Sequence, residues 1–320
     1  MTLKTKMERM IVSSYPNIAG VVVLKQGSIA YENYFNACTG TDTVHIFSVT
    51  KSIVSILLGI AIDKGYIQSV NQKVLDFFPD YHVKKNEKTI QSITIRDIIT
   101  MTAPYKYKEE PYAKYFSSDN WVDAALDSLG GTGRIGEFRY APIIGPDILS
   151  GILVKATGQS VLEFAKENLF KPLGIQVGPS IIFQNKEEQL TFYKAKKTSG
   201  WVTDPKGVNT AGWGLSLSPM DMAKIGQLYL DGGRLLDRQL VSNKWVEEST
   251  KEHSRCDQFK MSYGYLWWRI NDDAYAALGD GGNVIYVNEK KNQVVAIAAY
   301  FIPNTKKSLK LITEYIEPVF

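Results

Sequence analysis

The chain has 320 residues, of which 44% are hydrophobic and 22% charged, with a formal net charge of +4 and a pI near 8.7. This composition is typical of a globular protein with a large core, in one or two intertwined domains. Acidic and basic residues are interspersed, and the longest basic cluster, Lys194 with Lys196 and Lys197, is short. The charge pattern therefore argues against nucleic acid as a partner.

The N-terminus and the apolar runs predict no signal peptide and no integral membrane segment. Residues 1–6 lack an apolar stretch, and the most apolar run, from Ile53 to Ile62, is too short to span a bilayer. A cytoplasmic location is the expectation. Cys38 and Cys256 stand far apart without partners at metal-ligand spacing, so both are expected to be reduced.

The first predicted elements are a hairpin and a buried helix. The β-branched run from Ala19 to Lys25, a break at Gln26-Gly27, and the alternating stretch from Ser28 to Phe35 indicate two antiparallel strands. Residues 50–64 suit a helix that is apolar on nearly all sides, and Gly65 is a natural stop. A helix with this pattern is expected to be buried.

From about residue 73 to residue 205 the pattern becomes helical and rich in loops, and strand signals are scarce. The candidate helices are Ile95 to Thr102, Asn120 to Leu129, Ile148 to Thr157 and Val161 to Leu169.

The last third of the chain predicts strands between two helices. The elements are a helix from Pro219 to Leu230, strands from Tyr263 to Ile270, Val284 to Asn288 and Val294 to Phe301, and an amphipathic helix from Lys307 to Ile316. Since internal repeats and low-complexity linkers are absent from the sequence, we expect residues 1–72 and 206–320 to form an α/β body and residues 73–205 to form an inserted, mostly helical domain.

One short segment places a serine and a lysine on the same helical face. In His45-Ile46-Phe47-Ser48-Val49-Thr50-Lys51, the lysine follows the serine by three residues at the start of the buried helix. A serine hydroxyl becomes a good nucleophile when a neighbour takes its proton, and burial or nearby positive charge lowers the pKa of a lysine enough for that task. The alternative is that Ser48 caps the helix and Lys51 is a solvated residue of its first turn.

Other segments add to this pattern in a fixed order. They are Phe47 to Ser52, Thr94 to Thr102, Gly136-Glu137-Phe138-Arg139-Tyr140 with Leu149 to Gly158, Phe170 to Ile175, Gly212 to Leu215, Tyr263 to Trp268, and Gly279-Asp280-Gly281-Gly282 before a strand. With these segments the chain resembles, over nearly its whole length, the family of class C β-lactamases, DD-peptidases, related esterases and 6-aminohexanoate-dimer hydrolases.

The resemblance implies an α+β fold of the β-lactamase/transpeptidase type. In it, an antiparallel sheet flanked by helices carries the inserted helical domain, and the active site lies in the cleft between them, without a cofactor or metal. By position, Ser48 is then the acylated nucleophile, Lys51 the base or proton shuttle, and Tyr140 the phenol that relays the proton to the leaving group, with an ammonium nearby to stabilise its phenolate. The alternative for Tyr140 is a core aromatic residue with a bonded hydroxyl.

The resemblance also assigns a third element to a strand that lines the site. Asp280, Gly281 and Gly282 are the candidate residues for substrate binding, with a backbone N–H that forms an oxyanion hole together with the N–H of Ser48. Glycine suits this position because the backbone must come close to the substrate. An ordinary hairpin turn is the alternative, and both interpretations can hold at once.

Two departures from the family bear on the substrate. The sequence Tyr140-Ala141-Pro142 lacks the asparagine of many relatives, and Asp280 stands where β-lactamases have a Lys-Thr-Gly cation for the substrate carboxylate. An anionic substrate is then expected to meet a carboxylate and no compensating lysine. We therefore expect a small-molecule or short peptide-like substrate with an ester or uncharged amide, rather than a penicillin.

Other motifs carry less weight. Gly131 to Gly136 fits Gly-x-Gly-x-x-Gly but lacks the strand-turn-helix context of a dinucleotide site, so a loop is expected. Gly-x-Ser-x-Gly does not occur, and the three histidines show no metal-ligand spacing, although His45 either lines the pocket or supports the helix. The prediction is a serine hydrolase that works through an acyl-enzyme on Ser48. The alternatives are a non-hydrolytic penicillin-binding-like sensor or binding protein and a true β-lactamase or DD-peptidase.

Overall fold

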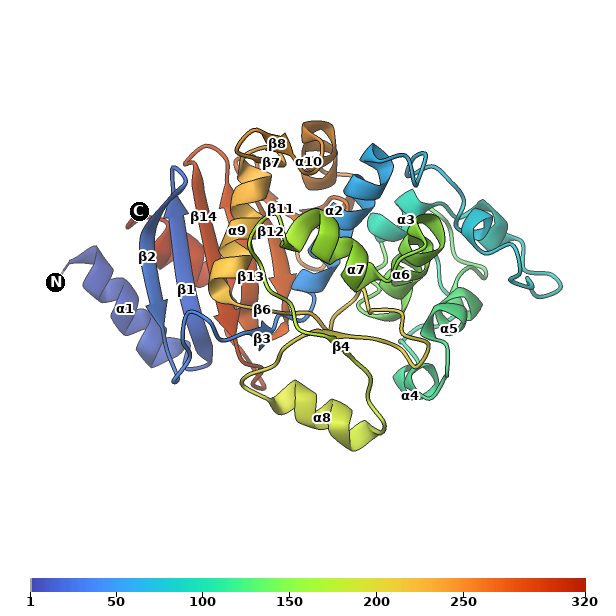
Figure 1. Cartoon of the computed structure of the whole chain (residues 1–320), viewed down its shortest axis with the longest axis horizontal. Helices are drawn as coiled ribbons and strands as arrows, with labels where there is room; N and C mark the ends of the chain where they lie inside the picture. The colour runs from blue at the N-terminus through green and yellow to red at the C-terminus, as the bar shows by residue number, and fades with distance from the viewer. Residues whose placement is uncertain (1) are drawn as a thin grey trace.

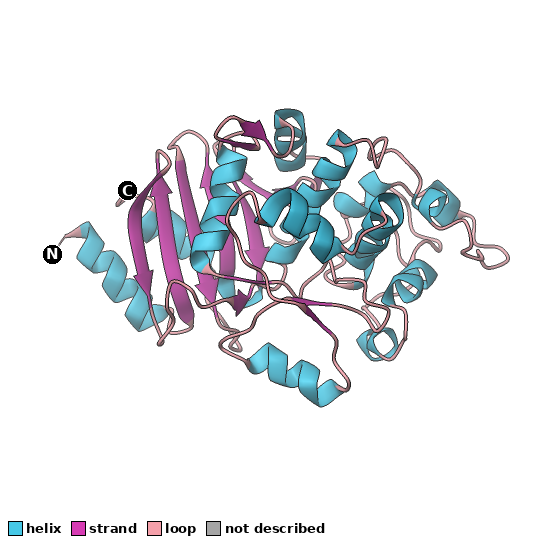
Figure 2. Ribbon diagram, viewed as in Figure 1, coloured by secondary structure: helices cyan, strands magenta, loops and turns pink. Residues whose placement is uncertain are grey.

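The computed structural model describes residues 2–320, and in that range one large antiparallel sheet is covered by helices on both faces (Figure 1, Figure 2). The strand order is β2-β1-β14-β13-β12-β11-β10-β9. The bounds are β1 Ile18–Lys25, β2 Ser28–Tyr34, β9 Ser254–Cys256, β10 Met261–Tyr263, β11 Trp268–Asn271, β12 Ala274–Gly279, β13 Asn283–Asn288 and β14 Gln293–Ala299. This confirms the predicted α+β fold class.

The central strands are apolar on both sides because a helical layer covers each face. Along β1, Val22 and Leu24 belong to one core, whereas Val21 and Val23 belong to the other, since successive side chains of a strand point to opposite faces. The strand therefore shows a continuous apolar run instead of alternation. Its partner β14 is buried along its whole length for the same reason.

The two faces are covered by different helices. On one face lie α9 (Pro219–Leu230), which contacts β1, β13 and β14, and α2 (Val49–Asp63), which contacts β12 and β13. The other core contains residues of α1 (Leu3–Ser14) and of the C-terminal α11 (Ser308–Leu311) with its π-helical continuation Ile312–Ile316. Both chain termini consequently lie at the same end of the molecule (Figure 1).

Helix α2 joins the sheet to the helices of the middle segment, because it also packs against α6. The helices of this segment are α3 Ile95–Ile99, α4 Tyr112–Phe116, α5 Trp121–Ser128, α6 Ile144–Thr157, α7 Val161–Ala165 with the π-helical residues Lys166–Phe170, and α8 Lys186–Lys194. Short elements complete the chain, namely β3 Val44–His45, β4 Ser180–Ile181, β5 Trp201–Val202, β6 Ser216–Leu217, β7 Arg234–Leu235, β8 Arg238–Gln239, α10 Asn243–Thr250, and the 3-10 turns Val74–Phe77, Thr89–Ser92 and Asp280–Gly282.

One predicted strand is wrong. The stretch from Tyr263 to Ile270 is two strands, β10 and β11, joined by a turn in which Leu266 has a positive φ of 62°. The backbone N–H groups of Tyr265 and Leu266 donate to Ser249 and Ile99, outside the sheet. These tertiary hydrogen bonds remove four apolar residues from the ladder, which a local pattern does not reveal.

Three further observations bear on the sequence predictions. Cys38 and Cys256 are free and buried. Residues 131–136 form a loop, as expected. Within residues 2–320, no helix has both the length and the apolar character needed to cross a bilayer.

Candidate active site

Ser48 stands at the N-cap of α2, directly after a residue with an unusual backbone. Phe47 has a φ of 49°, in the left-handed region, which costs a non-glycine residue about 1–2 kcal/mol. The ring of Phe47 packs on His45 with centroids 3.9 Å apart, and its carbonyl accepts a hydrogen bond from Thr50 Oγ1 at 2.6 Å. These contacts hold a sharp turn between β3 and α2, with Ser48 at the wall of a cavity.

The side chain of Ser48 turns toward Lys51 and, among residues 2–320, caps no backbone N–H of the helix. Lys51 Nζ donates to Ser48 Oγ at 2.7 Å and to the carbonyl of Gly212 at 2.9 Å. Lys51 is only 2% exposed. Ser48 thus occupies the N-cap position that the alternative interpretation gave it, but its side chain makes no capping hydrogen bond, and the solvated Lys51 of that interpretation is wrong.

Burial lowers the pKa of Lys51 to about 8, while the carboxylates of Asp280, Glu110 and Asp147 oppose this shift. A lysine with such a pKa is partly neutral near physiological pH, and its neutral amine can accept a proton. The ammonium form, in turn, donates the hydrogen bond that the geometry shows. Lys51 is thus able to take a proton from Ser48 and return it.

Tyr140 lines the same cavity as Ser48, from the loop that precedes α6. Its ring packs against Trp268, with centroids 5.8 Å apart, and Lys51 Nζ lies 5.6 Å from its centroid. Burial raises the pKa of Tyr140 above its ordinary value, although a hydrogen bond with Ser48 opposes this. Burial thus favours the phenol form of Tyr140, while the expected stabilisation of a phenolate by an ammonium stays a prediction.

The third element lies between β12 and β13, against the start of α2. A Cβ added to Gly279, the last residue of β12, would lie 2.4 Å from the carbonyl oxygen of Ile46 and 3.2 Å from the nitrogen of Val49. Only a glycine lets the strand end approach the nucleophile turn this closely. Gly279 lines the cavity as well. The sequence analysis recognised the motif that begins with Gly279 but did not predict Gly279 itself as a site residue.

Asp280, Gly281 and Gly282 all line the cavity, as predicted. The carbonyls of the two glycines bind other parts of the chain, whereas the side chain of Asp280 is exposed. The carbonyl of Gly281 accepts from Asn17 Nδ2 at 2.7 Å, and that of Gly282 accepts from Ser308 Oγ at 2.7 Å. These two bonds fix the turn to the residue before β1 and to the first residue of α11. Asp280 is exposed, and its charge acts on Lys51 and Tyr140.

The cavity at Ser48 has a volume of about 390 Å³. One wall is apolar and consists of Phe259, Met261, Trp268 and Leu278. Lys306 and Lys307 line the same cavity, with Lys307 Nζ 5.7 Å from the ring centroid of Phe259. The expectation that an anionic substrate meets no lysine here is therefore wrong, because the segment after β14 folds back to the site.

His45, one of the candidate pocket residues, has a structural place. It is buried, and its Nε2 accepts a hydrogen bond from the backbone N–H of Gly214 at 2.9 Å. Burial lowers its pKa to about 3, so the ring is neutral at physiological pH. In the described part of the chain, no cluster of three His, Cys, Asp or Glu side chains offers a metal site.

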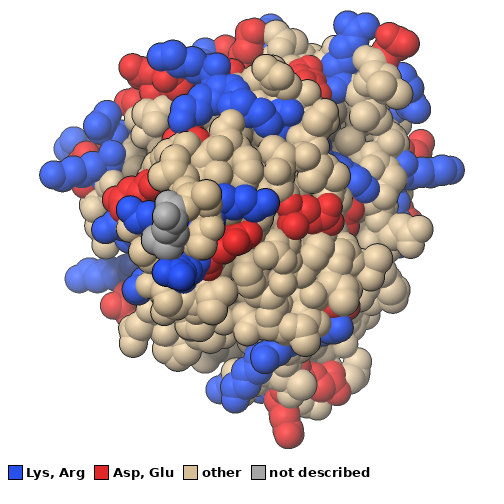
Figure 3. Space-filling model, turned by 90° about the vertical axis from the view of Figure 1, so that its left-hand side faces the viewer, with Lys and Arg blue, Asp and Glu red and all other residues tan. Residues whose placement is uncertain are grey.

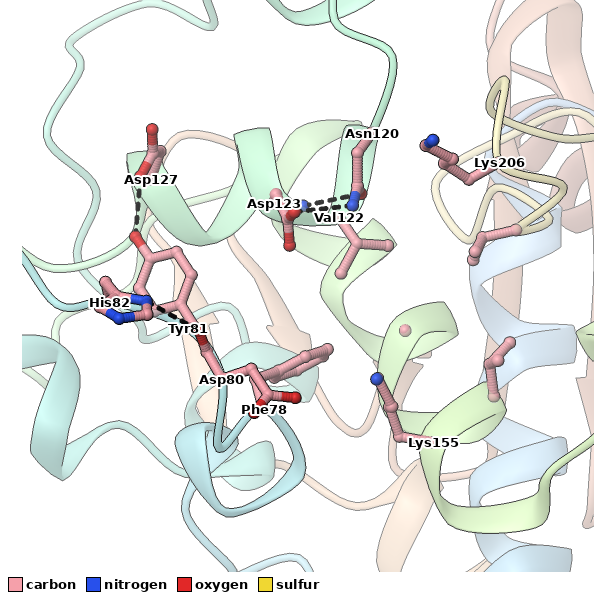
Figure 4. Close-up of a pocket in the computed structure, with 13 residues that line it drawn as sticks. Phe78, Asp80, Tyr81, His82, Asn120, Val122, Asp123, Asp127, Lys155 and Lys206 are labelled. Carbon is pink, nitrogen blue, oxygen red and sulfur yellow. Dashed lines mark hydrogen bonds between the residues drawn. The ribbon is translucent and has the colours of Figure 1, made fainter.

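A second hollow, of about 520 Å³, lies in the middle segment (Figure 4). Tyr81 donates to Asp127 at 2.8 Å and Asn120 donates to Asp123 at 2.7 Å, with Lys155 and Lys206 across the hollow. Its lining in residues 2–320 includes no serine, threonine or cysteine, and the hydroxyl of Tyr81 is bonded to Asp127. The pairing of a serine with a buried lysine is found instead at the cavity of Ser48.

The surface near the N-terminal end of the sheet carries both signs of charge. Figure 3 shows this face, where lysine and arginine alternate with aspartate and glutamate and large areas are uncharged. This mixed pattern agrees with the interspersed charges of the sequence.

Together, an antiparallel sheet, a buried helix that begins with Ser-x-x-Lys, and a tyrosine that faces the same cavity define the class of proteins with a penicillin-recognising fold. The model of the Beta-lactamase family matches residues 11–307, and the chain belongs to this family. Its relatives include the 6-aminohexanoate-dimer hydrolase of Paenarthrobacter ureafaciens, which is 23% identical over 306 residues, covering 88% of this chain and 72% of that protein.

Solved structures show the same fold at low identity. A penicillin-binding protein homologue from Caulobacter crescentus superposes with a TM-score of 0.75 at 16% identity, covering 99% of this chain and 96% of that one. A family VIII carboxylesterase gives a TM-score of 0.71 at 15% identity, with 100% and 98% covered. The family thus contains hydrolase and penicillin-binding relatives on one scaffold.

Proposed function

We propose that the protein is a serine hydrolase that works through an acyl-enzyme on Ser48. The observation that carries the proposal is the buried Lys51, whose Nζ lies 2.7 Å from Ser48 Oγ while the hydroxyl is free of any capping role among residues 2–320. A buried lysine costs stability unless its charge is compensated or partly lost. An amine held against the Ser48 hydroxyl at the wall of the cavity has a use as a base that accounts for its burial.

The proposed reaction has two steps. In the first, Lys51 takes the proton of Ser48, the alkoxide attacks the substrate carbonyl, and the N–H of Ser48 with a backbone N–H of the Gly279–Gly282 turn binds the oxyanion. Tyr140, which holds its proton, donates it to the leaving alcohol or amine and is reprotonated from Lys51. In the second step Lys51 takes a proton from a water molecule that attacks the acyl carbon, and it gives this proton to Ser48 Oγ as the ester bond breaks and the carboxylic acid leaves.

We propose that the substrate is a short ester or amide whose acyl group is neutral. The apolar wall of Phe259, Met261 and Trp268 suits such a group. Asp280 is among the carboxylates whose charge acts on Lys51 and Tyr140, whereas the two lysines of the cavity lie over aromatic rings, Lys307 on Phe259 and Lys306 on Tyr15. Asp280 therefore contributes to a preference for a neutral acyl group near the reacting carbonyl.

A fluorophosphonate tests the nucleophile. After incubation, peptide mass spectrometry is expected to find the added mass on the peptide that contains Ser48, and Ser48→Ala is expected to remove it. Ser52→Ala is the matched control, because Ser52 is a buried serine one turn along α2 whose hydroxyl donates to the carbonyl of Leu266 at 2.7 Å. Labelling that persists in Ser48→Ala contradicts the proposal.

A second candidate is a binding or sensor protein that is acylated but does not turn over. Pro142 in place of the family's asparagine and the missing Lys-Thr-Gly cation favour it. A panel of p-nitrophenyl esters, short D-amino-acid peptides and nitrocefin separates the candidates. Turnover of an ester or peptide supports the hydrolase, turnover of nitrocefin supports a β-lactamase, and stoichiometric acylation without turnover supports the sensor.

A further inference from the structure

Asp147 is a buried carboxylate that the proposed reaction leaves unused. It lies in the first turn of α6, seven residues after Tyr140, and is 3% exposed. Its Oδ1 accepts hydrogen bonds from the backbone N–H groups of Ala211 at 2.6 Å and Gly212 at 3.1 Å. Its Oδ2 accepts one from the Tyr115 hydroxyl at 2.6 Å.

The segment that Asp147 holds is the one that contacts Lys51. The carbonyl of the same Gly212, which belongs to the next peptide unit, accepts a hydrogen bond from Lys51 Nζ at 2.9 Å. Gly212 also packs so closely on the loop after Tyr140 that an added Cβ would lie 2.9 Å from the carbonyl oxygen of Pro142. Asp147 thus holds the nitrogen of the residue whose carbonyl contacts the lysine.

The orientation of this amine matters for proton transfer. A neutral lysine amine has two N–H bonds and one lone pair, and the lone pair must point to the serine hydroxyl if it is to accept the proton. A carbonyl that binds one N–H of Lys51 from the side of Gly212 restricts the rotation of the amine. A displacement of such a group by about 1 Å costs on the order of a hundredfold in rate.

We infer that Asp147 is a positioning residue that holds the Lys51 amine in line with Ser48 through the backbone of Gly212. The inference rests on the proposed function, because it assigns Asp147 to the same proton transfer. It adds a residue from α6, outside the three motifs that carry Ser48, Tyr140 and Gly279.

The charge of Asp147 has a separate effect on Lys51. Together with Asp280 and Glu110 it opposes the lowering of the pKa of Lys51, and burial raises the pKa of Asp147 itself to about 6. Tyr115 faces the carboxylate, and Glu110 adds a further negative charge. Loss of the charge is therefore expected to lower the pKa of Lys51 further, in addition to any change in geometry.

Two substitutions separate geometry from charge. In Asp147→Asn, the amide oxygen accepts from Ala211 and Gly212, and the amide nitrogen donates to the Tyr115 hydroxyl, so the position of the segment is kept. Asp147→Ala removes all of these bonds. Asp204→Asn is the matched control, because Asp204 is 1% exposed and its carboxylate accepts from the backbone N–H groups of Trp121, Lys206 and Val208, away from Gly212.

The measurement is kcat and KM for p-nitrophenyl butyrate from pH 5.5 to 10, with the rate of fluorophosphonate labelling of Ser48 and the melting temperature of each variant. Asp147→Ala is expected to lower kcat by about a hundredfold with little change in KM. Asp147→Asn is expected to keep most of kcat at high pH and to move the acidic limb of the profile to lower pH. Asp204→Asn is expected to leave the acidic limb of the pH profile of kcat at the same pH as in the wild type.

The inference is overturned if the folded Asp147 variants keep the kcat and the acidic limb of the wild type, or if their losses match those of Asp204→Asn. Failure of the proposed function gives a different result, since the wild type itself then lacks labelling at Ser48 and turnover.

Discussion

The start of α2 and the turn between β12 and β13 face the same cavity but are held in place by different means. At the start of α2, one helical turn sets the distance between Ser48 and Lys51, and burial sets the pKa of the lysine. The turn at Gly279–Gly282 comes from far along the chain, and contacts with Asn17 and Ser308 hold its carbonyls. The spacing of Ser48 and Lys51 thus depends on local geometry, whereas the burial of Lys51 and the position of the Gly279–Gly282 turn depend on tertiary assembly.

The largest effect is expected from the helix side. Lys51→Ala removes the base and is expected to lower the rate of Ser48 acylation by at least about 10³-fold, on the scale of losses in serine hydrolases that lose a member of the catalytic unit. The measurement is the pre-steady-state burst of p-nitrophenol with substrate in excess over enzyme. Lys64→Ala, an exposed lysine at the C-cap of the same helix, serves as control. Rapid acylation of Ser48 in Lys51→Ala contradicts the assignment of Lys51 as the base.

Tyr140→Phe keeps the ring and removes the proton that the leaving group needs. Turnover is expected to fall by about a hundredfold, the usual scale for a general acid–base group. Tyr263→Phe, whose ring lies 6.4 Å from that of Tyr140, is the control for aromatic packing. If the steady-state kcat of Tyr140→Phe equals that of the wild type, water or another tyrosine carries the proton.

The pH dependence follows from the pKa of Lys51, which burial lowers to about 8. Below pH 8 the amine is increasingly protonated and loses its lone pair, so kcat/KM for a neutral ester is expected to fall by about tenfold per pH unit. Above pH 8 the profile is expected to level off. A rate profile that is flat from pH 6 to pH 9 shows that Lys51 is not the base.

Gly279→Ala tests the close approach of the end of β12 to the turn before α2. The new Cβ, 2.4 Å from the Ile46 carbonyl oxygen, is expected to push β12 away from the nucleophile turn. We expect about 1–3 kcal/mol of lost stability from overpacking and about a tenfold loss in kcat/KM. Gly158→Ala, in an open position with a φ of 71°, should cost stability without a change in the activity of the folded protein. Equal activity in both variants means that the contact is structural only.

The smallest effect is expected at Asp280, because its side chain is exposed and water screens its charge. Asp280→Asn is expected to raise kcat/KM for the p-nitrophenyl half-ester of succinate by about threefold relative to p-nitrophenyl butyrate. Asp273→Asn, on the turn at the far end of β12, is the control. No relative gain in Asp280→Asn means that this carboxylate does not govern the charge preference.

Elements with strong local signals were predictable from the sequence. Helix α9 begins and ends where the pattern predicts, because Ser218 caps it, Pro219 suits its first turn, and the apolar stripe is regular. The hairpin of β1 and β2 carries its own turn at Gln26-Gly27. By contrast, α10 was missed because its sequence, Asn243–Thr250, has few apolar residues and begins on the cap of Ser242.

The site residues likewise divide into those that the sequence predicted and those that it did not. Ser48 and Lys51 were predictable because three residues on a helix define a distance, and the family motif placed Tyr140 at the same cavity. Asp147 and the lysines after β14 gave no signal. Asp147 reaches Ala211 and Gly212 across 64 and 65 residues of chain, and Lys306 reaches the cavity only because β14 ends beside the turn of β12 and β13.

The pairing of β1 with β14 has a consequence for how the chain folds. Ile18 pairs with Ala299, so the first hairpin of the sheet joins its neighbour only after nearly the whole chain is available. Contacts of such long sequence separation slow folding and leave apolar surface exposed in the meantime. During synthesis, α2 emerges with Ser48 long before β12 and β13 exist to cover it. The cavity around Ser48 is therefore complete only when the last strands have been made, and a nascent chain that stops before β13 is expected to lack this cavity and to expose apolar surface.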